Sequence, residues 1–376
     1  MRVLHLALED HRRPGSGGGS LRNFEINSRL AALGFSVDVV AAAFPGARER
    51  LEAGVRYRHV GLPRGYAPSL LTYQACLPAT VLRAAHSAPP DLIVEEFAPL
   101  TSSLGVGHWT KLPTVGLVQG FFAREKAEQY HLPSRLLMAI ERWGARSHPQ
   151  LIAVSAALRD QLVLAAPAST VTVVPNGVDL VAAAKARERR VAREATAPAT
   201  ILYLGRLEIH QKGLDNLFAA LAQVTTDVRL VIAGAGRDQQ RLRSLAANPL
   251  VSDRVTFVGE VHGEAKWKLI ADADAVVQPS RYETFGITAL ESMACGTPLV
   301  ASDLPCIREL VPAGAGLLVP SSDVRALGEA IMRVIGDSEL QRRMGAIGAQ
   351  AARRYDWDVC AEAQAAVYQR AVEGEG

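Results

Sequence analysis

Residues 274–303 read DAVVQPSRYETFGITALESMACGTPLVASD. Two short apolar runs, AVVQPS and PLVASD, flank a segment with helical spacing that begins near Ile287 and closes at Gly296. A strand, a helix and a second strand in this order predict one unit of a parallel sheet. The helix carries the chain back to the end of the sheet where the first strand began, so the second strand runs in the same direction. Glu283 follows the first strand and Glu291 lies about one turn inside the helix, so we expect both carboxylates near one edge of the sheet.

The same alternation extends over the whole chain in two blocks. The apolar runs of the first block are VLHLAL, FSVDVVAAAF, DLIVEEF, PTVGLVQG and QLIAVS. In the second block, ATILYLGRL, VRLVIAGAG and RVTFVGEV precede the stretch above, and GLLVP follows it. Short buried strands separated by helices predict an α/β fold with two doubly wound, Rossmann-like domains. We expect these domains over 1–175 and 176–357, joined near 176–199, and a final helix over about 358–376 that packs on one of them.

Composition limits the class of protein. A chain of 376 residues with 49% apolar and 21% charged residues is typical of a folded, two-domain protein. The net charge is only +3, with the excess of basic residues before residue 176. This excess could meet an anionic substrate or a membrane surface, but we expect a solvated face, and we expect no nucleic-acid partner. The four cysteines lie far apart, which argues against a zinc site or a disulfide framework. Without a leader-like or membrane-spanning run, we expect a cytoplasmic location.

Glycines follow the first strand in the segment GSGGGS, residues 15–20. In open parallel sheets the ligand lies beyond the carboxyl ends of the strands. Glycine lets the backbone approach a phosphate there, and the start of the following helix, expected near Leu21, offers free N–H groups. Phosphate binding by Gly18 and Gly19 and a plain flexible turn both remain open on this pattern alone.

Two cations follow the strand ILYLG in the segment GRLEIHQKG, residues 205–213. Arg206 emerges at the carboxyl end of that strand, and Lys212 comes just before a helix. A guanidinium and an ammonium in these places predict binding of one anionic group, since both donate to phosphate oxygens. The alternative is a loop with two exposed cations.

The glutamates complete this pattern. The backbone amides of Phe285, Gly286 and Ile287 lie at the start of a helix, where they favour an anion. A carboxylate inside that helix can accept hydrogen bonds from vicinal hydroxyls, as acidic residues do with ribose in dinucleotide sites. We therefore expect a diphosphate between two polyols, with Glu291 on the ribose and Glu283 on a second sugar. The predicted ligand is a nucleotide sugar, which is a substrate, and we expect no cofactor.

Two weaker patterns do not change this prediction. GAGRDQ, residues 234–239, is an incomplete dinucleotide fingerprint, because Gln239 stands where a third glycine is needed. It is better explained as a tight strand-to-helix turn. Asp272 and Asp274 precede their strand, at the end opposite the predicted ligand, so we expect solvated charges and no metal site.

Together these segments resemble the retaining glycosyltransferases of the GT-B fold, family 4 in particular. The resemblance rests on Glu283 and Glu291 as an E-x7-E signature around Phe285-Gly286, and on the segments GRL…KG, VPNGVD and GTPLVASD. It implies two Rossmann-like domains with a cleft between them. It also implies a C-terminal domain that binds a nucleoside-diphosphate (NDP) sugar, an N-terminal domain that binds the acceptor, and a final helix that crosses back onto the N-terminal domain.

The resemblance further implies roles for single residues. The candidate catalytic residues are Arg206 and Lys212, which would neutralise the diphosphate, and Glu283, which would hold sugar hydroxyls. The candidate donor-binding residues are Gly18, Gly19, Gln119, Gly259, Val261, Phe285, Gly286, Ile287 and Glu291. The backbone from Gly259 to Val261 would lie near the nucleobase. The candidate acceptor-binding residues are Arg22, Glu95, Glu96 and Phe121.

The first half leaves both substrates open. Family members often carry a histidine where this chain has Gln119, whose amide binds hydroxyls but cannot become cationic, and this leaves the donor sugar open. The acceptor is equally open: a polar small molecule, a glycan or a lipid head-group would suit. The helix SRLLMAIERWGARS, residues 134–147, carries basic and aromatic residues that suit a membrane surface, but we expect it to pack on the sheet.

The expected reaction is glycosyl transfer with retention and without a metal, in which cations and the helix start stabilise the leaving diphosphate. One alternative is an NDP-sugar epimerase or hydrolase on the same fold, with further acid–base groups around the sugar. The other is a nucleotide-sugar-binding module without turnover. Consumption of the donor without an acceptor would favour the first alternative, and binding without turnover the second.

Overall fold

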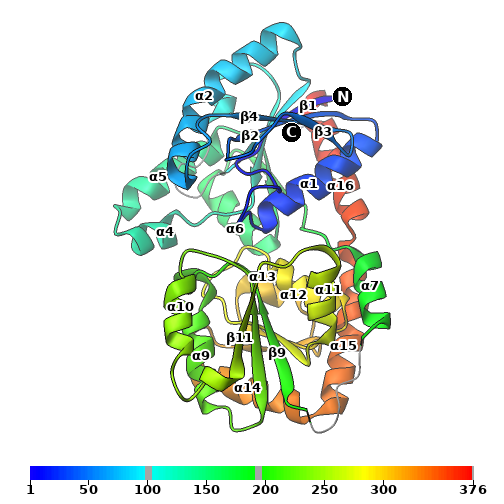
Figure 1. Ribbon diagram of the computed structural model, residues 1–376. Helices are drawn as coiled ribbons and strands as arrows, with labels where there is room; N and C mark the ends of the chain where they lie inside the picture. Colours follow the sequence, from blue (N-terminus) through cyan, green and yellow to red (C-terminus); the bar gives the residue numbers. More distant parts are fainter. Residues whose placement is uncertain (98–103, 191–196, 375–376) are drawn as a thin grey trace. The chain divides into compact units, whose positions relative to one another are not determined.

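The computed structural model describes residues 1–97, 104–190 and 197–374. The chain divides into two compact units (Figure 1), one formed by Met1–Asn176 with Trp357–Gly376 and the other by Gly177–Asp356. Each unit is built on a mostly parallel sheet with helices packed against it, and this confirms the predicted fold class. Part of the expected joint between the domains, residues 191–196, lies outside the described residues.

The first unit has an eight-stranded sheet in the order β3-β4-β2-β1-β5-β6-β7-β8. Its strands are β1 (Arg2–Leu6), β2 (Ser36–Ala42), β3 (Arg50–Glu52), β4 (Val55–Val60), β5 (Leu92–Glu96), β6 (Thr114–Val118), β7 (Gln150–Ala153) and β8 (Thr170–Val173). Its helices are α1 (Gly18–Ala32), α2 (Tyr66–Ser87), α3 (Val106–Trp109), α4 (Ala123–Tyr130), α5 (Ser134–Arg146), α6 (Ala156–Ala165) and α16 (Trp357–Glu373).

The sequence prediction missed β8 and the β3–β4 hairpin of this sheet. β3 pairs antiparallel with β4, whereas β4 pairs parallel with β2. The signal was present in Val55–Val60, VRYRHV, where Val55 and Tyr57 are buried and Arg56 and Arg58 are exposed. Alternation with a period of two is typical of a strand with one buried face.

The core of the first unit includes the last helix of the chain. α16 packs against α1 (Figure 1), and its residues Trp357, Val367 and Tyr368 are almost fully buried. They belong to the same apolar cluster as Ile26 of α1 and Val94 of β5. The end of the chain thus contributes to the core of the unit that begins it.

The second unit has a six-stranded parallel sheet in the order β11-β10-β9-β12-β13-β14. Its strands are β9 (Ala199–Leu204), β10 (Val228–Ala233), β11 (Val255–Gly259), β12 (Ala275–Gln278), β13 (Leu299–Ser302) and β14 (Gly316–Val319). Its helices are α7 (Leu180–Glu188), α8 (Ile209–Lys212), α9 (Leu214–Gln223), α10 (Gln239–Ala246), α11 (Gly263–Asp272), α12 (Ile287–Ala294), α13 (Pro305–Leu310), α14 (Val324–Gly336) and α15 (Ser338–Ala352).

The GAGRDQ segment has a packing role in this unit. Gly234 has φ +144°, and a Cβ there would lie 1.9 Å from the carbonyl oxygen of Gly205. A Cβ on Gly236 would lie 2.4 Å from the carbonyl oxygen of Leu207. Both glycines therefore let the loop after β10 contact the loop after β9, which carries Arg206.

Asp272 and Asp274 differ from each other. Asp272 ends α11 and pairs with Lys268. Asp274 is buried, and its Oδ2 accepts a hydrogen bond from the backbone N–H of Thr200 at 2.8 Å. The expectation of solvated charge is therefore wrong for Asp274, because this carboxylate joins the start of β12 to the start of β9.

The helix predicted to pack on the sheet, α5, packs against α4 and α6. Its buried residues are Glu141, Gly144 and Ala145. Leu136, Ile140 and Trp143 have exposed fractions of 57%, 37% and 48%, so the expectation is wrong for its largest apolar side chains. In the described part of the chain, no helix has the length and apolar character required to span a bilayer.

Candidate active site

Glu283 lies in the loop between β12 and α12, at the carboxyl end of its strand. Its Oε1 accepts hydrogen bonds from Lys212 Nζ at 2.5 Å, Ser280 Oγ at 2.9 Å and Gln278 Nε2 at 3.3 Å. The side chain is 10% exposed. Because Ser280 and Gln278 contact the same oxygen as the lysine, they can hold the carboxylate in place when Lys212 turns to another anion.

Glu291 lies in α12 and has a lysine partner of its own. Its Oε1 accepts from Lys266 Nζ at 2.7 Å, and the two side chains are 7% and 17% exposed. Lys266 also stands over the Trp267 ring, 4.4 Å from its centroid. Sequence reasoning missed Lys266. The available signal was its place near the start of the helix that follows Val261, beside the loop expected near the nucleobase.

The start of α12 depends on Gly286. This residue has φ +100°, and a Cβ there would lie 2.5 Å from Ile307 Cδ1. Both the backbone conformation and the space therefore require glycine. The N–H groups in the first turn have no acceptor within the helix, which leaves the amide of Ile287 able to face a ligand. Phe285 is buried and packs edge-on against Tyr355, with 5.9 Å between ring centroids.

Arg206 and Lys212 lie on the same short segment between β9 and α9. Arg206 is exposed, and its Nη2 lies 3.4 Å from Oε1 of Gln211, the residue before Lys212. Gly213 ends α8 with φ +64°, and a Cβ there would lie 2.1 Å from the carbonyl oxygen of Pro279. This close approach brings Lys212 to the loop that carries Glu283.

The loop after β12 is held by Arg281. Its guanidinium donates to both carboxylate oxygens of Asp215, at 2.9 and 2.8 Å, and to the carbonyl oxygen of Ile209 at 2.8 Å. A bidentate pair of this kind fixes direction as well as distance. The candidate ligand-binding loop is therefore anchored to the starts of α8 and α9.

The expected nucleobase contacts follow β11, the edge strand of the sheet, which lies two strands from β9. Gly259 ends β11 with φ +79°, and its carbonyl oxygen accepts from Gly234 N at 2.7 Å. Val261 follows in the half-buried loop before α11. Nucleobase binding by this segment stays a prediction.

In the first unit, Gln119 is tied to the start of α1. This helix begins at Gly18, earlier than expected, so Gly18 and Gly19 are its first residues. The Gln119 Nε2 donates to Glu96 Oε1 at 2.6 Å, to the Gly19 carbonyl oxygen at 3.2 Å and to Asn23 Oδ1 at 3.3 Å. A Cβ on Gly19 would lie 3.2 Å from Gln119 Oε1. Gln119 is thus not a solvent-facing strand end, and its contact with a sugar stays a prediction.

Glu96 receives donors on both carboxylate oxygens. Besides Gln119, the backbone N–H of Leu8 donates to it at 3.0 Å and Asn23 Nδ2 at 2.9 Å. Burial raises the pKa of Glu96 to about 7, against the effect of the hydrogen bonds from Leu8 and Asn23. Near neutral pH this carboxyl group is therefore partly protonated.

Two of the expected acceptor-binding residues are buried within the first unit. Arg22 is 0% exposed and donates to Gln364 Oε1 of α16 at 2.7 Å. Glu95 accepts from the backbone N–H groups of Leu104 and Val106 at 2.6 and 3.0 Å. These contacts stabilise the unit, and acceptor binding by Arg22 or Glu95 stays a prediction. Phe121, half-buried just before α4, stays a candidate.

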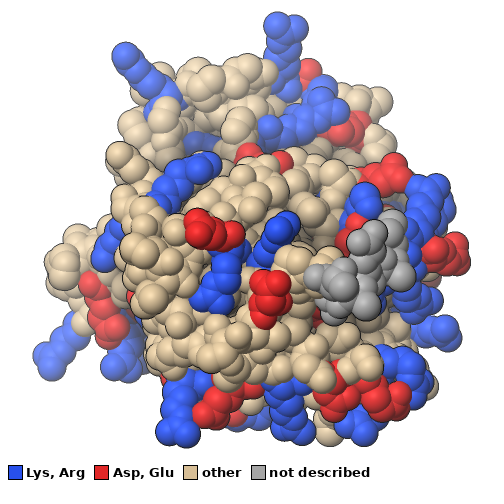
Figure 2. All heavy atoms as spheres, turned by 60° about the horizontal axis from the view of Figure 1, so that its bottom comes forward, with Lys and Arg blue, Asp and Glu red and all other residues tan. Residues whose placement is uncertain are grey.

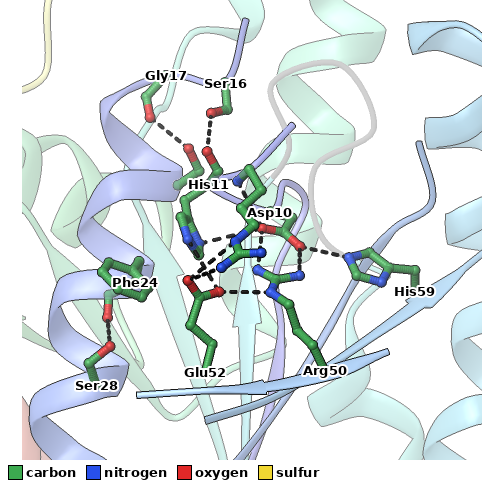
Figure 3. Close-up of polar contacts among 11 residues, drawn as sticks. Asp10, His11, Ser16, Gly17, Phe24, Ser28, Arg50, Glu52 and His59 are labelled. Carbon is green, nitrogen blue, oxygen red and sulfur yellow. Dashed lines mark hydrogen bonds and ion pairs between the residues drawn. The ribbon is translucent and has the colours of Figure 1, made fainter. Parts of the chain in front are cut away.

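A polar cluster that the sequence analysis missed follows β1 (Figure 3). We call it the Asp10 cluster; it comprises Asp10, His11, Arg12, Arg50, Glu52 and His59. Asp10 is buried and accepts from His59 Nε2 at 2.7 Å and from Arg50 Nη1 and Nη2 at 2.6 and 2.9 Å. Burial acts to raise the pKa of Asp10, but these donors outweigh it and hold the pKa well below its usual range. The cluster anchors the glycine-rich loop to the β3–β4 hairpin.

The surface charge shown in Figure 2 is mixed rather than of one sign. In Figure 2, Lys and Arg side chains are interspersed with Asp and Glu over the face shown, which is typical of a solvated surface. Among residues 1–97, 104–190 and 197–374, no three His, Cys, Asp or Glu side chains gather as a metal ion would require.

Known families match both halves of the chain. Residues 16–181 match the family described as Glycosyltransferase Family 4, and residues 184–351 match Glycosyl transferases group 1. A glycogen synthase of Mycobacterium tuberculosis is 32% identical over 351 residues, which cover 91% of this chain and 78% of the relative. A GDP-mannose-dependent alpha-(1-6)-phosphatidylinositol dimannoside mannosyltransferase of the same species is 28% identical over 356 residues, covering 91% and 90%.

Solved structures match over nearly the full length. A sucrose-phosphate synthase of Thermosynechococcus elongatus superposes with a TM-score of 0.85 at 24% identity, covering 99% of both chains. Anabaena HepE, in complex with UDP and glucose, gives 0.76 at 21% identity, covering 98% of this chain and 99% of its own. At these identities the structures show the fold, and the sequence relatives show the family. The chain therefore belongs to glycosyltransferase family 4 and is a glycosyltransferase with the GT-B fold.

Proposed function

We propose that the protein transfers a sugar from an NDP-sugar to an acceptor with retention of the anomeric configuration. The observation that carries this proposal is the pair of carboxylate–lysine contacts, Glu283 with Lys212 and Glu291 with Lys266. Lys212 can exchange its carboxylate for a donor phosphate, which frees Glu283 for sugar hydroxyls, whereas Lys266 can stay beside Glu291 and balance its charge. Crystal structures of Anabaena HepE with UDP and with UDP-glucose support this class of donor.

In the proposed complex the second unit holds the donor. Arg206 and Lys212 bind the diphosphate together with the N–H groups at the start of α12. Glu291 accepts from the ribose hydroxyls and Glu283 from hydroxyls of the transferred sugar. Gly259 and Val261 border the nucleobase. Lys266 is added to the donor-binding set, because its ammonium lies 2.7 Å from Glu291 and balances that charge beside an anionic ligand.

The proposed role of the first unit is to bind the acceptor and the transferred sugar. Gly18 and Gly19 offer the start of α1 to a phosphate, and Gln119 offers its amide to a sugar hydroxyl. Glu96 and Phe121 are the proposed acceptor contacts. The acceptor class stays open between a small molecule, a glycan and a lipid head-group.

The proposed step forms no bond to the enzyme. The bond between the sugar C1 and the phosphate oxygen breaks, and its electron pair remains on the NDP. Arg206, Lys212 and the α12 amides stabilise this developing charge. An acceptor hydroxyl attacks C1 from the face that the NDP leaves, and its proton passes to the departing phosphate oxygen. We propose that no metal takes part, since the protein supplies the cations.

The test is an assay of purified protein with UDP-glucose and GDP-mannose against panels of soluble sugars, sugar phosphates and glycolipids. We expect NDP release that depends on an acceptor and persists in EDTA, and an α-linked product from an α-linked donor by NMR. A β-linked product would refute retention. Complete loss of activity in EDTA, restored by Mg²⁺ or Mn²⁺, would refute metal independence.

A further inference from the structure

One exposed helix face lies outside the proposed donor and acceptor residues. Leu136, Ile140 and Trp143 of α5 are 57%, 37% and 48% exposed, and their spacing of four and three places them on one side of the helix. We call them the α5 stripe. Leu132, four residues before Leu136, is also exposed at 44%. Exposed apolar side chains in such a row are typical of an interaction site, whereas single ones need no explanation.

The exposed charges on α5 itself are all basic, whereas α4, which packs against it, carries both Arg124 and Glu128. At about 100° per residue, Arg135, Arg142 and Arg146 fall in a row along one side of the stripe. All three are exposed, and Arg146 Nε donates to the Ala165 carbonyl oxygen. The single acidic residue of α5, Glu141, is buried, and it accepts from the backbone amides at the start of α4. The face therefore combines apolar surface with positive charge.

Trp143 is held outward by its neighbours. Its ring lies 5.0 Å from the His108 ring, centroid to centroid, and a Cβ on Gly105 would lie 2.6 Å from Trp143 Cη2. Gly105 has φ +64°, so glycine permits this close approach. Trp109, next to His108, is itself 40% exposed. Indole rings fixed in this way suit the boundary between water and hydrocarbon.

We propose that α5 docks the protein on the surface of a bilayer that contains anionic phospholipids. The helix has 13 residues, about 20 Å, which is too short to cross the hydrocarbon but long enough to lie in the interfacial plane. In that plane the α5 stripe enters the acyl boundary, and the arginines pair with lipid phosphates. Figure 1 shows α4 and α5 at an edge of the first unit away from α1 and α16.

Vesicle binding tests this proposal. The full-length protein is sedimented with vesicles of phosphatidylcholine alone and of phosphatidylcholine with phosphatidylglycerol. We expect binding to the anionic vesicles and little to the neutral ones. The double variant Leu136→Ala/Ile140→Ala should bind at least about tenfold more weakly. Arg135→Gln/Arg142→Gln should bind at least about tenfold more weakly at low salt, with the difference shrinking in high salt.

Matched controls lie in the second unit. Leu250 is 64% exposed, and Arg325 is exposed on α14; Leu250→Ala and Arg325→Gln should bind anionic vesicles as the wild type does. Brominated lipids should quench the tryptophan fluorescence of the wild type and quench Trp143→Phe much less. Thermal unfolding of every variant checks that it is folded, and transfer to a soluble acceptor should remain unchanged in the α5 variants.

Three outcomes would overturn the proposal. The first is equal binding to neutral and anionic vesicles, and the second is loss of binding in the controls as large as in the α5 variants. The third is absence of vesicle binding together with a dimer in solution that the α5 variants dissociate, because the stripe would then be an interface between copies. The proposal does not rest on the proposed donor or mechanism, so an inactive protein that binds vesicles would still support it.

Discussion

Glutamates have different partners in the two units. In the second unit, Glu283 and Glu291 each accept from a lysine ammonium, Lys212 or Lys266. An ammonium at the end of a flexible four-carbon chain can turn to a phosphate and return. These carboxylates are therefore held in a way that a ligand can replace.

In the first unit, Glu95 and Glu141 accept from backbone N–H groups at the starts of α3 and α4. A backbone amide at a helix start cannot move away without loss of the helix end. Residue type and position in the fold do not separate the carboxylates that we propose to bind a ligand from those that hold the fold together. Their partners, a lysine ammonium or a backbone amide, separate them.

The largest expected effect is on the stability of the first unit. Glu95→Ala removes the acceptor of two backbone N–H groups and the carboxylate 3.0 Å from His148 Nε2. We expect the free energy of unfolding to fall by roughly 3–5 kcal/mol in urea denaturation. The control Glu49→Ala removes an exposed partner of Arg58 and should cost less than about 0.5 kcal/mol. Equal losses of unfolding free energy in Glu95→Ala and Glu49→Ala would show that Glu95 is not a structural carboxylate.

The next effect is a pH dependence at Glu141. Burial raises its pKa to about 8, against the hydrogen bonds from the α4 start, while its ordinary value is 4.5. The folded chain therefore binds the proton more tightly than the unfolded chain. Relative to Glu141→Gln, the free energy of unfolding of the wild type should fall as the pH rises from the ordinary pKa towards the folded pKa. The expected fall is roughly 3 kcal/mol between pH 5 and 8. Urea denaturation of both proteins at the two pH values measures this; parallel pH profiles would contradict it.

Lys212→Ala should affect catalysis and spare the fold. Without the ammonium, kcat/KM should fall about a hundredfold, because the leaving diphosphate loses a charged partner. The free energy of unfolding should change by less than about 1 kcal/mol, since Ser280 and Gln278 still hold Glu283. Arg206→Ala should lower activity in the same direction. Lys268→Ala, which removes an exposed partner of Asp272, is the control; a loss of activity in it equal to that in Lys212→Ala would show that neither lysine acts at the site.

The two glutamates of the second unit should separate by ligand. Glu291→Gln should weaken binding of free NDP and of NDP-sugar about tenfold, because the ribose loses a charged acceptor. Glu283→Gln should leave the affinity for free NDP unchanged. It should weaken only the additional affinity that the sugar contributes to binding of the NDP-sugar. Calorimetry with both ligands measures this. The reverse pattern would mean that the two roles are exchanged.

The smallest expected effect is at Gln119. Gln119→Ala should lower kcat/KM by about 2- to 10-fold, the value of one neutral hydrogen bond. Gln119→His should shift the preference among donor sugars, because imidazole also donates to hydroxyls. Kinetics with several NDP-sugars test both variants. Wild-type kinetics with a lowered melting temperature would show that Gln119 only joins β6 to the start of α1.

Sequence patterns were sufficient where the signal is local. Every predicted strand of the second unit is present, since short apolar runs between helices leave few other solutions. They failed where a side chain could take either of two environments. The α5 helix has enough apolar residues for core packing, yet its buried residues are Glu141, Gly144 and Ala145, and Leu136, Ile140 and Trp143 remain exposed. Asp274 was likewise expected in solvent, because nothing in its neighbourhood along the chain indicates that Thr200 needs an acceptor.

The alternation of strands and helices, the family, and the places of Glu283 and Glu291 around the start of α12 can all be predicted from the sequence. The partners of these two glutamates depend on the tertiary fold. Lys212 and Glu283 are 71 residues apart, and Lys266 and Glu291 are 25 apart. Local spacing cannot specify such pairs, because they form when a parallel sheet brings the carboxyl ends of separate strands to one edge. Periodicity is a property of neighbours along the chain, whereas the charge that an ionisable group meets depends on the fold.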